Sequence, residues 1–291
     1  MSLNRTERMN AQILWMMSRY LNDAPDFIRP AEVRELSQSC GLPPQEAFSL
    51  LLAASCGLNI DEQPQDRELY QRYFPQMVHC LNAAEYEENA YYQAVRLPRT
   101  RSGKCELRQA RYKPCEAFVC DDILQMPDGR TIPQIGFFEA GFTYPALLED
   151  GRVWMSVTPN EITTMETPLC AARGHVLTYG LGMGYFAYMA SRKAAVSSVT
   201  VVEQNADVVA LFQQHILPQF EHADKMRVVQ GDAFAFAAQR TPGDGFDFVF
   251  ADLWHDVGDG LAMYKRLKRL EDRNPDSDYA YWIERSMRCY L

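Results

Sequence analysis

The residues best suited to chemistry form a run of alternating glycines in the second half of the chain. The strand-like segment Val176–Tyr179 leads into Gly180-Leu181-Gly182-Met183-Gly184, and a helical pattern follows it. Glycines at such a place let the backbone turn sharply and let a ligand approach it closely. Because a strand precedes them and a helix follows, the three glycines indicate a ligand-binding turn and not only a tight turn.

Acidic residues follow the next two strand-like segments. Glu203 directly follows the segment Val199–Val202, and a carboxylate there typically accepts hydrogen bonds from both hydroxyls of a ribose. Asp232 follows the segment Arg227–Val229, where an acid can bind an adenine amino group while Phe234 or Ala233 flanks the ring. Asp232 is equally suited to cap the helix that begins after it.

A fourth strand-like segment, Phe246–Ala251, is followed by several residues that could handle a proton. Asp252, His255 and Asp256 are the candidate catalytic residues, because each can remove a proton from an acceptor. His255 can also be a structural or exposed side chain, and Trp254 is expected to pack rather than to touch substrate. We expect all four strand ends at the C-terminal edge of one sheet, where such folds bind ligands.

The elements that position these residues alternate between strand and helix from His175 onward. Helices are predicted at Phe186–Arg192, Ala206–His215 and Phe234–Gln239, between the strands. This alternation indicates a parallel sheet covered by helices on both faces. At the C-terminus Leu261–Leu270 reads as a basic helix, and the spacing of the last aromatic residues predicts a second helix: Tyr279, Trp282, Ile283, Met287 and Tyr290.

The first hundred residues favour helices. Apolar residues recur at helical spacing from Met9 to Leu21. A second helix is predicted to start at Pro30 and to end at Gly41, and a third to start at Pro43-Pro44. Another helical region is expected over Asp66–Leu97, interrupted near Pro75. A linker is expected at Pro98–Lys104. Two hairpins are then predicted, around Pro127-Asp128-Gly129 and Glu149-Asp150-Gly151, with a helix over Pro159–Ala172.

These patterns predict an α/β protein in three parts. They are a helical N-terminal domain (1–100), a linker and β-hairpin region (101–158), and a Rossmann-like domain (159–291). Only 35 residues follow Asp256 in the chain of 291, so the sheet is expected to be C-terminally truncated. The exposed edge of its fourth strand would then need a cover, which the terminal helix, the N-terminal domain or a second subunit could supply.

Composition excludes several classes of protein. Apolar residues make up 47% and charged residues 23%, which argues against a disordered chain. The net charge of -9 argues against a general nucleic-acid binder. No apolar stretch is long enough for a membrane span, and the eight cysteines are scattered without metal-ligand spacing, so we expect a cytoplasmic protein with reduced thiols and no metal. Arg96–Lys113 is locally basic, either as a solvated linker or as an attractor of an anionic acceptor.

The glycine run and the two acids resemble class I S-adenosylmethionine-dependent methyltransferases. The dinucleotide fingerprint would need glycine where this chain has Tyr185. In the methyltransferase family, the acid after the second strand holds the ribose and the acid after the third holds the adenine. The resemblance therefore implies S-adenosylmethionine as cofactor, held by Gly180, Leu181, Gly182, Met183, Gly184, Glu203, Gln204, Asp232, Ala233 and Asp252.

A narrower resemblance is to the spermidine synthase-like (polyamine synthase) branch of that fold. It is carried by the segments Val176–Gly180, Val201–Glu203, Leu217–Phe220 and Val229–Ala233, and it covers Val153 to Asp256. True aminopropyltransferases carry an aspartate in the glycine loop, where this chain has Met183, and a D-S-S-D-type motif where it has Asp252–Asp256. An acid at 183 would repel the carboxylate of S-adenosylmethionine, so neutral Met183 favours the ordinary cofactor over its decarboxylated form.

Three functions remain open from the sequence. The first is methyl transfer to an unidentified acceptor, most simply a small molecule, in a protein that could be a homodimer. The second is aminopropyl transfer from decarboxylated S-adenosylmethionine. The third is a non-catalytic nucleotide-binding protein, which the short C-terminus favours.

Overall fold

The chain forms two compact units, each with its own hydrophobic core. The structure is a computed structural model that describes residues 4–271 and 274–291. The first unit extends to Glu85 and includes Arg111–Thr143, and the second comprises Tyr86–Ala110 and Tyr144–Leu291. The expected boundaries at residues 100 and 158 therefore do not coincide with the divisions between units. Instead, the chain passes between units three times, once inside helix α5 (Ala83–Glu87) and twice inside strands, β3 (Cys105–Tyr112) and β6 (Phe142–Glu149).

The first unit packs helices against a three-stranded sheet. Strand β5 lies between β1, parallel to it, and β4, antiparallel to it. The predicted hairpin around Asp128 is confirmed as β4 and β5, but it belongs to this helical unit because α1 and α4 pack on β5. The elements are α1 (Arg5–Asp23), α2 (Pro30–Cys40), α3 (Pro44–Ser55), α4 (Pro64–Met77), β1 (Val78–Cys80), β4 (Phe118–Gln125) and β5 (Thr131–Phe137).

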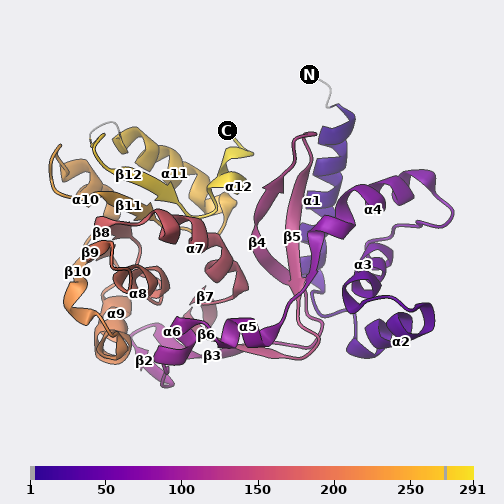
Figure 1. The fold of residues 1–291 in the computed structure, drawn as a ribbon, viewed down its shortest axis with the longest axis horizontal. Helices are drawn as coiled ribbons and strands as arrows, with labels where there is room; N and C mark the ends of the chain where they lie inside the picture. Colours follow the sequence, from indigo (N-terminus) through magenta and orange to yellow (C-terminus); the bar gives the residue numbers. More distant parts are fainter. Residues whose placement is uncertain (1–3, 272–273) are drawn as a thin grey trace. The chain divides into compact units, whose positions relative to one another are not determined.

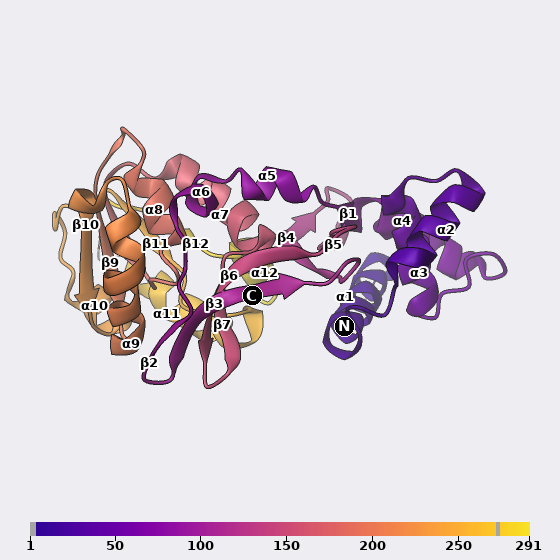
Figure 2. The same cartoon turned by 90° about the horizontal axis from the view of Figure 1, so that it is seen from below.

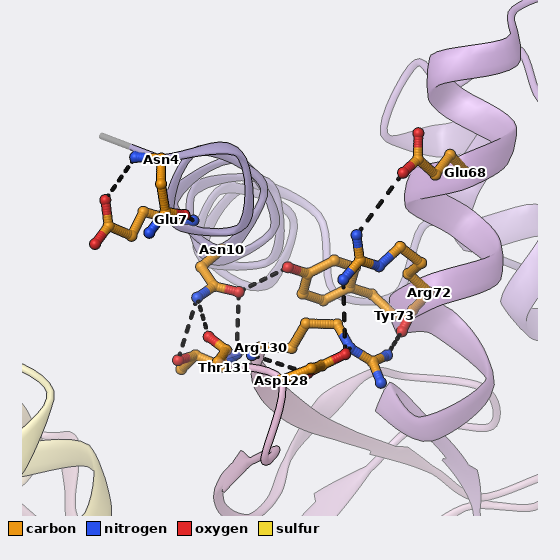
Figure 3. A network of polar contacts seen from close by, with 10 residues as sticks. Asn4, Glu7, Asn10, Glu68, Arg72, Tyr73, Asp128, Arg130 and Thr131 are labelled. Carbon is orange, nitrogen blue, oxygen red and sulfur yellow. Dashed lines mark hydrogen bonds and ion pairs between the residues drawn. The ribbon is translucent and has the colours of Figure 1, made fainter. Parts of the chain in front are cut away.

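Polar contacts around Asn10 join three elements of the first unit (Figure 3). Asn10 Oδ1 accepts hydrogen bonds from the Tyr73 hydroxyl of α4 at 2.7 Å and from the Thr131 amide of β5 at 3.0 Å. Its Nδ2 donates to the Gly129 carbonyl in the hairpin turn at 2.9 Å. One side chain of α1 therefore fixes both α4 and the β4–β5 turn.

The second unit is built around a five-stranded parallel sheet in the order β10-β9-β8-β11-β12. Successive strands run outward from β8 to β10, and the chain then returns to the other side of β8 for β11 and β12. The order reverses between β8 and β11, and the carboxyl ends of all five strands share one edge. In open sheets of this kind, ligands bind in the crevice at such a reversal.

Helices cover both faces of the parallel sheet (Figure 1). Phe250 and its partner Thr178 share one face, on which Phe186 of α8 stacks at 4.2 Å between ring centroids. Tyr179 points to the opposite face, where Phe236 of α10 contacts it. Helix α9 lies alongside β9 and β10 (Figure 2). The predicted parallel α/β arrangement is thus present.

The remaining elements of the second unit include a four-stranded sheet in the order β2-β3-β6-β7. The hairpin predicted around Asp150 is confirmed by the antiparallel pair β6–β7. The other elements are α6 (Ala90–Ala94), β2 (Thr100–Ser102), β7 (Arg152–Ser156), α7 (Pro159–Ala171), β8 (Gly174–Tyr179), α8 (Tyr185–Ser191), β9 (Val196–Glu203), α9 (Ala206–Leu211), β10 (Met226–Gln230), α10 (Ala233–Gln239), β11 (Phe248–Ala251), α11 (Val257–Glu271), β12 (Asp278–Tyr281) and α12 (Glu284–Arg288). A π-helical turn (Phe212–Ile216) extends α9, two 3₁₀ turns (Leu217–Gln219, Ala223–Lys225) precede β10, and α5 (Ala83–Glu87) spans the division between units.

Three expectations about individual elements were wrong. The linker expected at Pro98–Lys104 contains strand β2, which pairs with β3. The helical region expected to Leu97 is broken by β1, whose Val78 is fully buried and pairs with Ile135. The last residues do not form one long helix, because Asp278–Tyr281 pair in register with β11 as strand β12. This strand covers the edge of β11 that the terminal helix, the N-terminal domain or a second subunit was expected to cover.

No helix in the described parts of the chain, residues 4–271 and 274–291, has the length and apolar character needed to cross a lipid bilayer.

Candidate active site

A cavity of about 310 Å³ lies at the carboxyl edge of the parallel sheet, within the second unit. This size is at the lower end of the range for small-molecule pockets. Its walls come from strand β7, helix α7, the glycine loop after β8 and the residues that follow β9, β10 and β11. Ten of the predicted site residues line it: Gly180, Leu181, Gly182, Met183, Glu203, Gln204, Asp232, Ala233, Asp252 and His255.

The glycine loop needs glycine for two reasons: it passes close to the backbone after β11, and it adopts positive φ angles. Gly180 has φ of +94°, and a Cβ built there would lie 1.9 Å from the Asp252 carbonyl oxygen, so the loop can contact the end of β11 only with glycine. Gly182 has φ of +54°, and only the Met155 sulfur lies within 4 Å of where its Cβ would be, at 4.0 Å. Because Gly182 has no side chain, the pocket wall has free space beside it.

Glu203 braces the glycine loop from β9. Its Oε2 accepts a hydrogen bond from the Leu181 amide at 3.2 Å, and its Oε1 accepts one from the Asn205 amide at 2.8 Å. The side chain is only 6% exposed. Each carboxylate oxygen has a second lone pair, so both can still accept a hydrogen bond from a ligand in the pocket.

Helix α6 supports the loop from behind. The Tyr91 hydroxyl donates to the Met183 carbonyl at 2.6 Å, and Asn89 Nδ2 donates to the Tyr185 hydroxyl at 3.1 Å. Burial raises the pKa of Tyr91, so this hydroxyl stays a donor at all physiological pH values. The Met183 side chain is buried and neutral on the pocket wall.

Two of the predicted acids have structural partners. Asp232 Oδ1 accepts from the Ala235 amide at 2.6 Å and so caps α10, while the residue also lines the pocket. Asp256 is not among the lining residues. Its Oδ1 accepts from the Gly258 amide at 2.6 Å in the first turn of α11. The structure therefore brings Asp252 and His255 to the cavity and places Asp256 beside it, as a helix cap.

A cluster of three carboxyl groups makes the pocket acidic. Glu161 of α7, Glu203 and Asp252 all line it, and Glu161 was not anticipated from the sequence. Burial and the nearby Glu203 charge raise the pKa of Asp252, while burial and the Asp252 charge raise the pKa of Glu161. Such a cluster attracts a ligand with positive charge.

Aromatic residues near Asp252 divide between packing and the pocket wall. Trp254 is 5% exposed and packs against Tyr264 and Tyr281, as expected, but it also lines the cavity. Its Nε1 has no hydrogen-bond partner within the residues that the structure describes. Trp154 of β7 also lines the pocket, is 41% exposed, and contacts the His255 ring. The sequence pattern around Trp154 indicated only a hairpin strand.

The basic stretch predicted at Arg96–Lys113 is not among the pocket-lining residues. Arg99 and Arg101 both form ion pairs with Glu106 at 3.0 Å, and Lys104 pairs with Asp150 at 3.2 Å. These cations lie on and beside the β2–β3 hairpin with acidic partners of their own. The residues that the structure describes hold no group of acids, cysteines and histidines arranged for a metal ion.

Comparison with known proteins gives no family. No protein-family model matches the chain, and no curated protein matches it. One similar solved structure is a conserved hypothetical protein from Streptococcus pyogenes, 21% identical, with 34% of this chain and 61% of that chain covered and a TM-score of 0.27. Another is precorrin 8W decarboxylase from Methanobacterium thermoautotrophicum, 16% identical, with 43% and 63% covered and a TM-score of 0.33. This chain spans less than two thirds of either one, and likenesses at these TM-scores carry no argument about it.

Proposed function

We propose that the chain is an S-adenosylmethionine-dependent methyltransferase whose cofactor occupies the cavity at the carboxyl edge of the parallel sheet. The observation that carries the proposal is the convergence of the glycine loop and Glu203 on that cavity, joined by the hydrogen bond from the Leu181 amide. The reversal of strand order between β8 and β11, the place where open α/β sheets bind ligands, supports it.

The residues present fit this cofactor. The space beside Gly182 admits close approach of a ligand to the loop, Glu203 can accept from ribose hydroxyls, and Asp232 with Ala233 can border an adenine. When bound, S-adenosylmethionine supplies a methyl group on a positively charged sulfur. The chain's own part is to hold the acceptor in line with that methyl group, to attract the positive charge with Glu161 and Asp252, and to receive the acceptor's proton.

Calorimetry with S-adenosylhomocysteine and S-adenosylmethionine tests the proposal directly. Wild-type protein should bind both, and Gly182→Val should abolish binding because a branched Cβ fills the space beside the loop and its backbone angle suits glycine. Gly151→Ala in the β6–β7 turn, also at positive φ and with open space around it, is a control for strain alone. Normal cofactor binding by a folded Gly182→Val protein would overturn the proposal.

The acidic cluster favours a second candidate function, aminopropyl transfer from decarboxylated S-adenosylmethionine. Glu161 and Asp252 would repel the carboxylate of the ordinary cofactor, whereas the decarboxylated form lacks that group. Neutral Met183 acts the other way, and the raised pKa values of Glu161 and Asp252 weaken the repulsion by both carboxyl groups. These opposing effects leave methyl transfer as the leading proposal.

Relative affinities decide between the two functions. We expect wild-type protein to prefer S-adenosylmethionine, and Met183→Asp to shift the ratio toward the decarboxylated form by about ten- to a hundredfold. Met183→Leu, which keeps the position apolar, should leave the ratio unchanged. Tighter wild-type binding of the decarboxylated form, measured at fixed ionic strength, would replace methyl transfer with aminopropyl transfer.

A further inference from the structure

The imidazole of His255 is held on the pocket wall by two neighbours. Its Nδ1 lies 2.9 Å from Asp259 Oδ2, and its ring meets the Trp154 ring edge to face, with centroids 4.0 Å apart and planes at 74°. Its Nε2 has no hydrogen-bond partner in the described ranges 4–271 and 274–291. One ring nitrogen is therefore engaged, and the other is left for a molecule in the pocket.

Asp259 fixes the position of this imidazole and of the loop that carries it. Its Oδ1 accepts from the amides of His255 at 3.2 Å and Asp256 at 3.1 Å, while Oδ2 faces the imidazole. Partial burial acts to raise the pKa of Asp259, but the hydrogen bonds from His255 and the loop hold it below its usual range. An ionised carboxylate can only accept, so a neutral His255 must place its proton on Nδ1 and keep a lone pair on Nε2.

Trp154 adds an apolar surface to the same wall. It is 41% exposed, and its neighbour Val153 is 49% exposed, although both line the cavity. An indole face favours contact with a second flat ring. The carboxyl groups of Glu161 and Asp252 on the pocket wall make an anionic acceptor unfavourable.

We propose that His255, positioned by Asp259 and Trp154, accepts the proton of a flat aromatic acceptor that carries an un-ionised O–H or N–H group. This inference rests on methyl transfer as the proposed function of the pocket. In the step, the acceptor oxygen or nitrogen forms a bond to the methyl carbon. The carbon–sulfur bond breaks with its electron pair left on sulfur, and the acceptor's proton moves to His255 Nε2. The resulting imidazolium faces the Asp259 carboxylate. Asp259 is a positioning residue, since it acts through His255.

Nitrogen NMR of the full chain, labelled with ¹⁵N-histidine, tests the positioning without any ligand. His255→Gln identifies the signals of His255 among the five histidines. We expect the neutral ring to carry its proton on Nδ1 in wild-type protein and to change to the Nε2–H form in Asp259→Ala. Glu271→Gln, which removes a carboxylate from the far end of the same helix, should change nothing. A wild-type proton on Nε2, or an unchanged tautomer in Asp259→Ala, would overturn the proposal.

Phenol and anisole test the acceptor class, because they share a ring and only phenol has the O–H. With protein saturated by S-adenosylhomocysteine, phenol should shift both the Trp154 indole signal and the His255 Nε2 signal. Anisole should shift the first alone, and Trp154→Ala should weaken phenol binding about two- to tenfold. Phenol binding that leaves His255 Nε2 unchanged, or no phenol binding, would overturn the proposal. If S-adenosylhomocysteine itself does not bind, the proposed function fails, while the tautomer result still stands on its own.

Discussion

The Glu203 carboxylate holds the glycine loop in place and also borders the cavity in which we propose that the cofactor binds. Its carboxylate accepts from the Leu181 and Asn205 amides while it borders the cavity. Loss of this group should therefore both loosen the glycine loop and remove the proposed partner of the ribose hydroxyls. We therefore expect a substitution that keeps the size of the side chain but removes its charge to weaken binding less than one that removes the whole carboxylate.

Glu203→Ala should weaken S-adenosylhomocysteine binding by about 1.5–3 kcal/mol, because hydrogen bonds to a charged group have this magnitude. Glu203→Gln, which keeps the size and one carbonyl acceptor, should lose less. Calorimetry on both variants, with circular dichroism as the check on folding, measures the difference. Unchanged affinity in a folded Glu203→Ala protein would show that the ribose assignment is wrong.

Asp252 makes the stability of the second unit depend on pH. Burial and the nearby Glu203 charge raise the pKa of Asp252 to about 7 in the folded protein, above its value of about 3.9 in an unfolded chain. Between these values the unfolded chain has lost the proton that the folded chain keeps. Stability should therefore fall as pH rises from about 4 to 7.

Asp252→Asn should reduce this pH dependence and stabilise the second unit at pH 7 by about 1–3 kcal/mol, since one pKa unit corresponds to about 1.4 kcal/mol and the half-buried site retains some solvent. Urea unfolding at pH 5 and pH 7 measures it. Glu149→Gln, an acid outside the pocket lining, serves as control. An equal pH slope in wild type and Asp252→Asn would contradict the cause assigned here.

The sequence predicted those residues of the candidate site that belong to a local pattern along the chain. It did not predict the residues that only the three-dimensional fold brings to the cavity. The position of Gly180–Met183 and Glu203 at the cavity was predictable because a strand, a turn and the end of the next strand are local patterns. Gly184 was expected to bind the cofactor, but it is not among the lining residues and packs against Phe212 and Phe220. Glu161 lines the pocket from helix α7 and Trp154 from hairpin strand β7, and no motif in the sequence indicated that either would lie there. Asp259 stands four residues after His255, a spacing that places two residues on one face of a helical turn and could have indicated the pair.

At the scale of elements, side-chain spacing misled where a strand is short. Strand β12 has four residues, too few for alternation to outweigh a helical spacing of apolar residues that starts inside it, at Tyr279, Trp282, Ile283, Met287 and Tyr290. Strand β1 has three residues and is defined by its pairing with β5, which lies more than 50 residues later in the chain. Long helices such as α1 were predictable because their apolar spacing is repeated over several turns.

Asn10 allows a test of how much the polar contacts between α1, α4 and β5 stabilise the first unit. Asn10→Ala should lower the free energy of unfolding of that unit by about 1–3 kcal/mol, because the Tyr73 hydroxyl and the Thr131 amide lose their partner (Figure 3). Asn22→Ala, in the last turn of the same helix and bonded only within it, should cost less. Equal destabilisation by the two variants in chemical unfolding would mean that the junction contributes nothing of its own.

At the scale of the whole molecule, the two units have separate hydrophobic cores. One core gathers residues of α1, α3, α4 and β5, and the other gathers residues of the parallel sheet with its helices. The cavity and every residue that lines it belong to the second unit. A ligand of that cavity should therefore stabilise only the unit that contains it.

Hydrogen exchange read by mass spectrometry can follow both units in one experiment. S-adenosylhomocysteine at a hundred times its dissociation constant should stabilise the second unit by about 2.7 kcal/mol, which slows exchange of peptides from β8 and β9 about a hundredfold. Peptides from α1 and α4 should exchange as before. Asn10→Ala should do the reverse, accelerating α1 and α4 while β8 and β9 keep their rates. If the ligand slows both sets of peptides equally, the two units unfold as one, and neither core is a cooperative unit by itself.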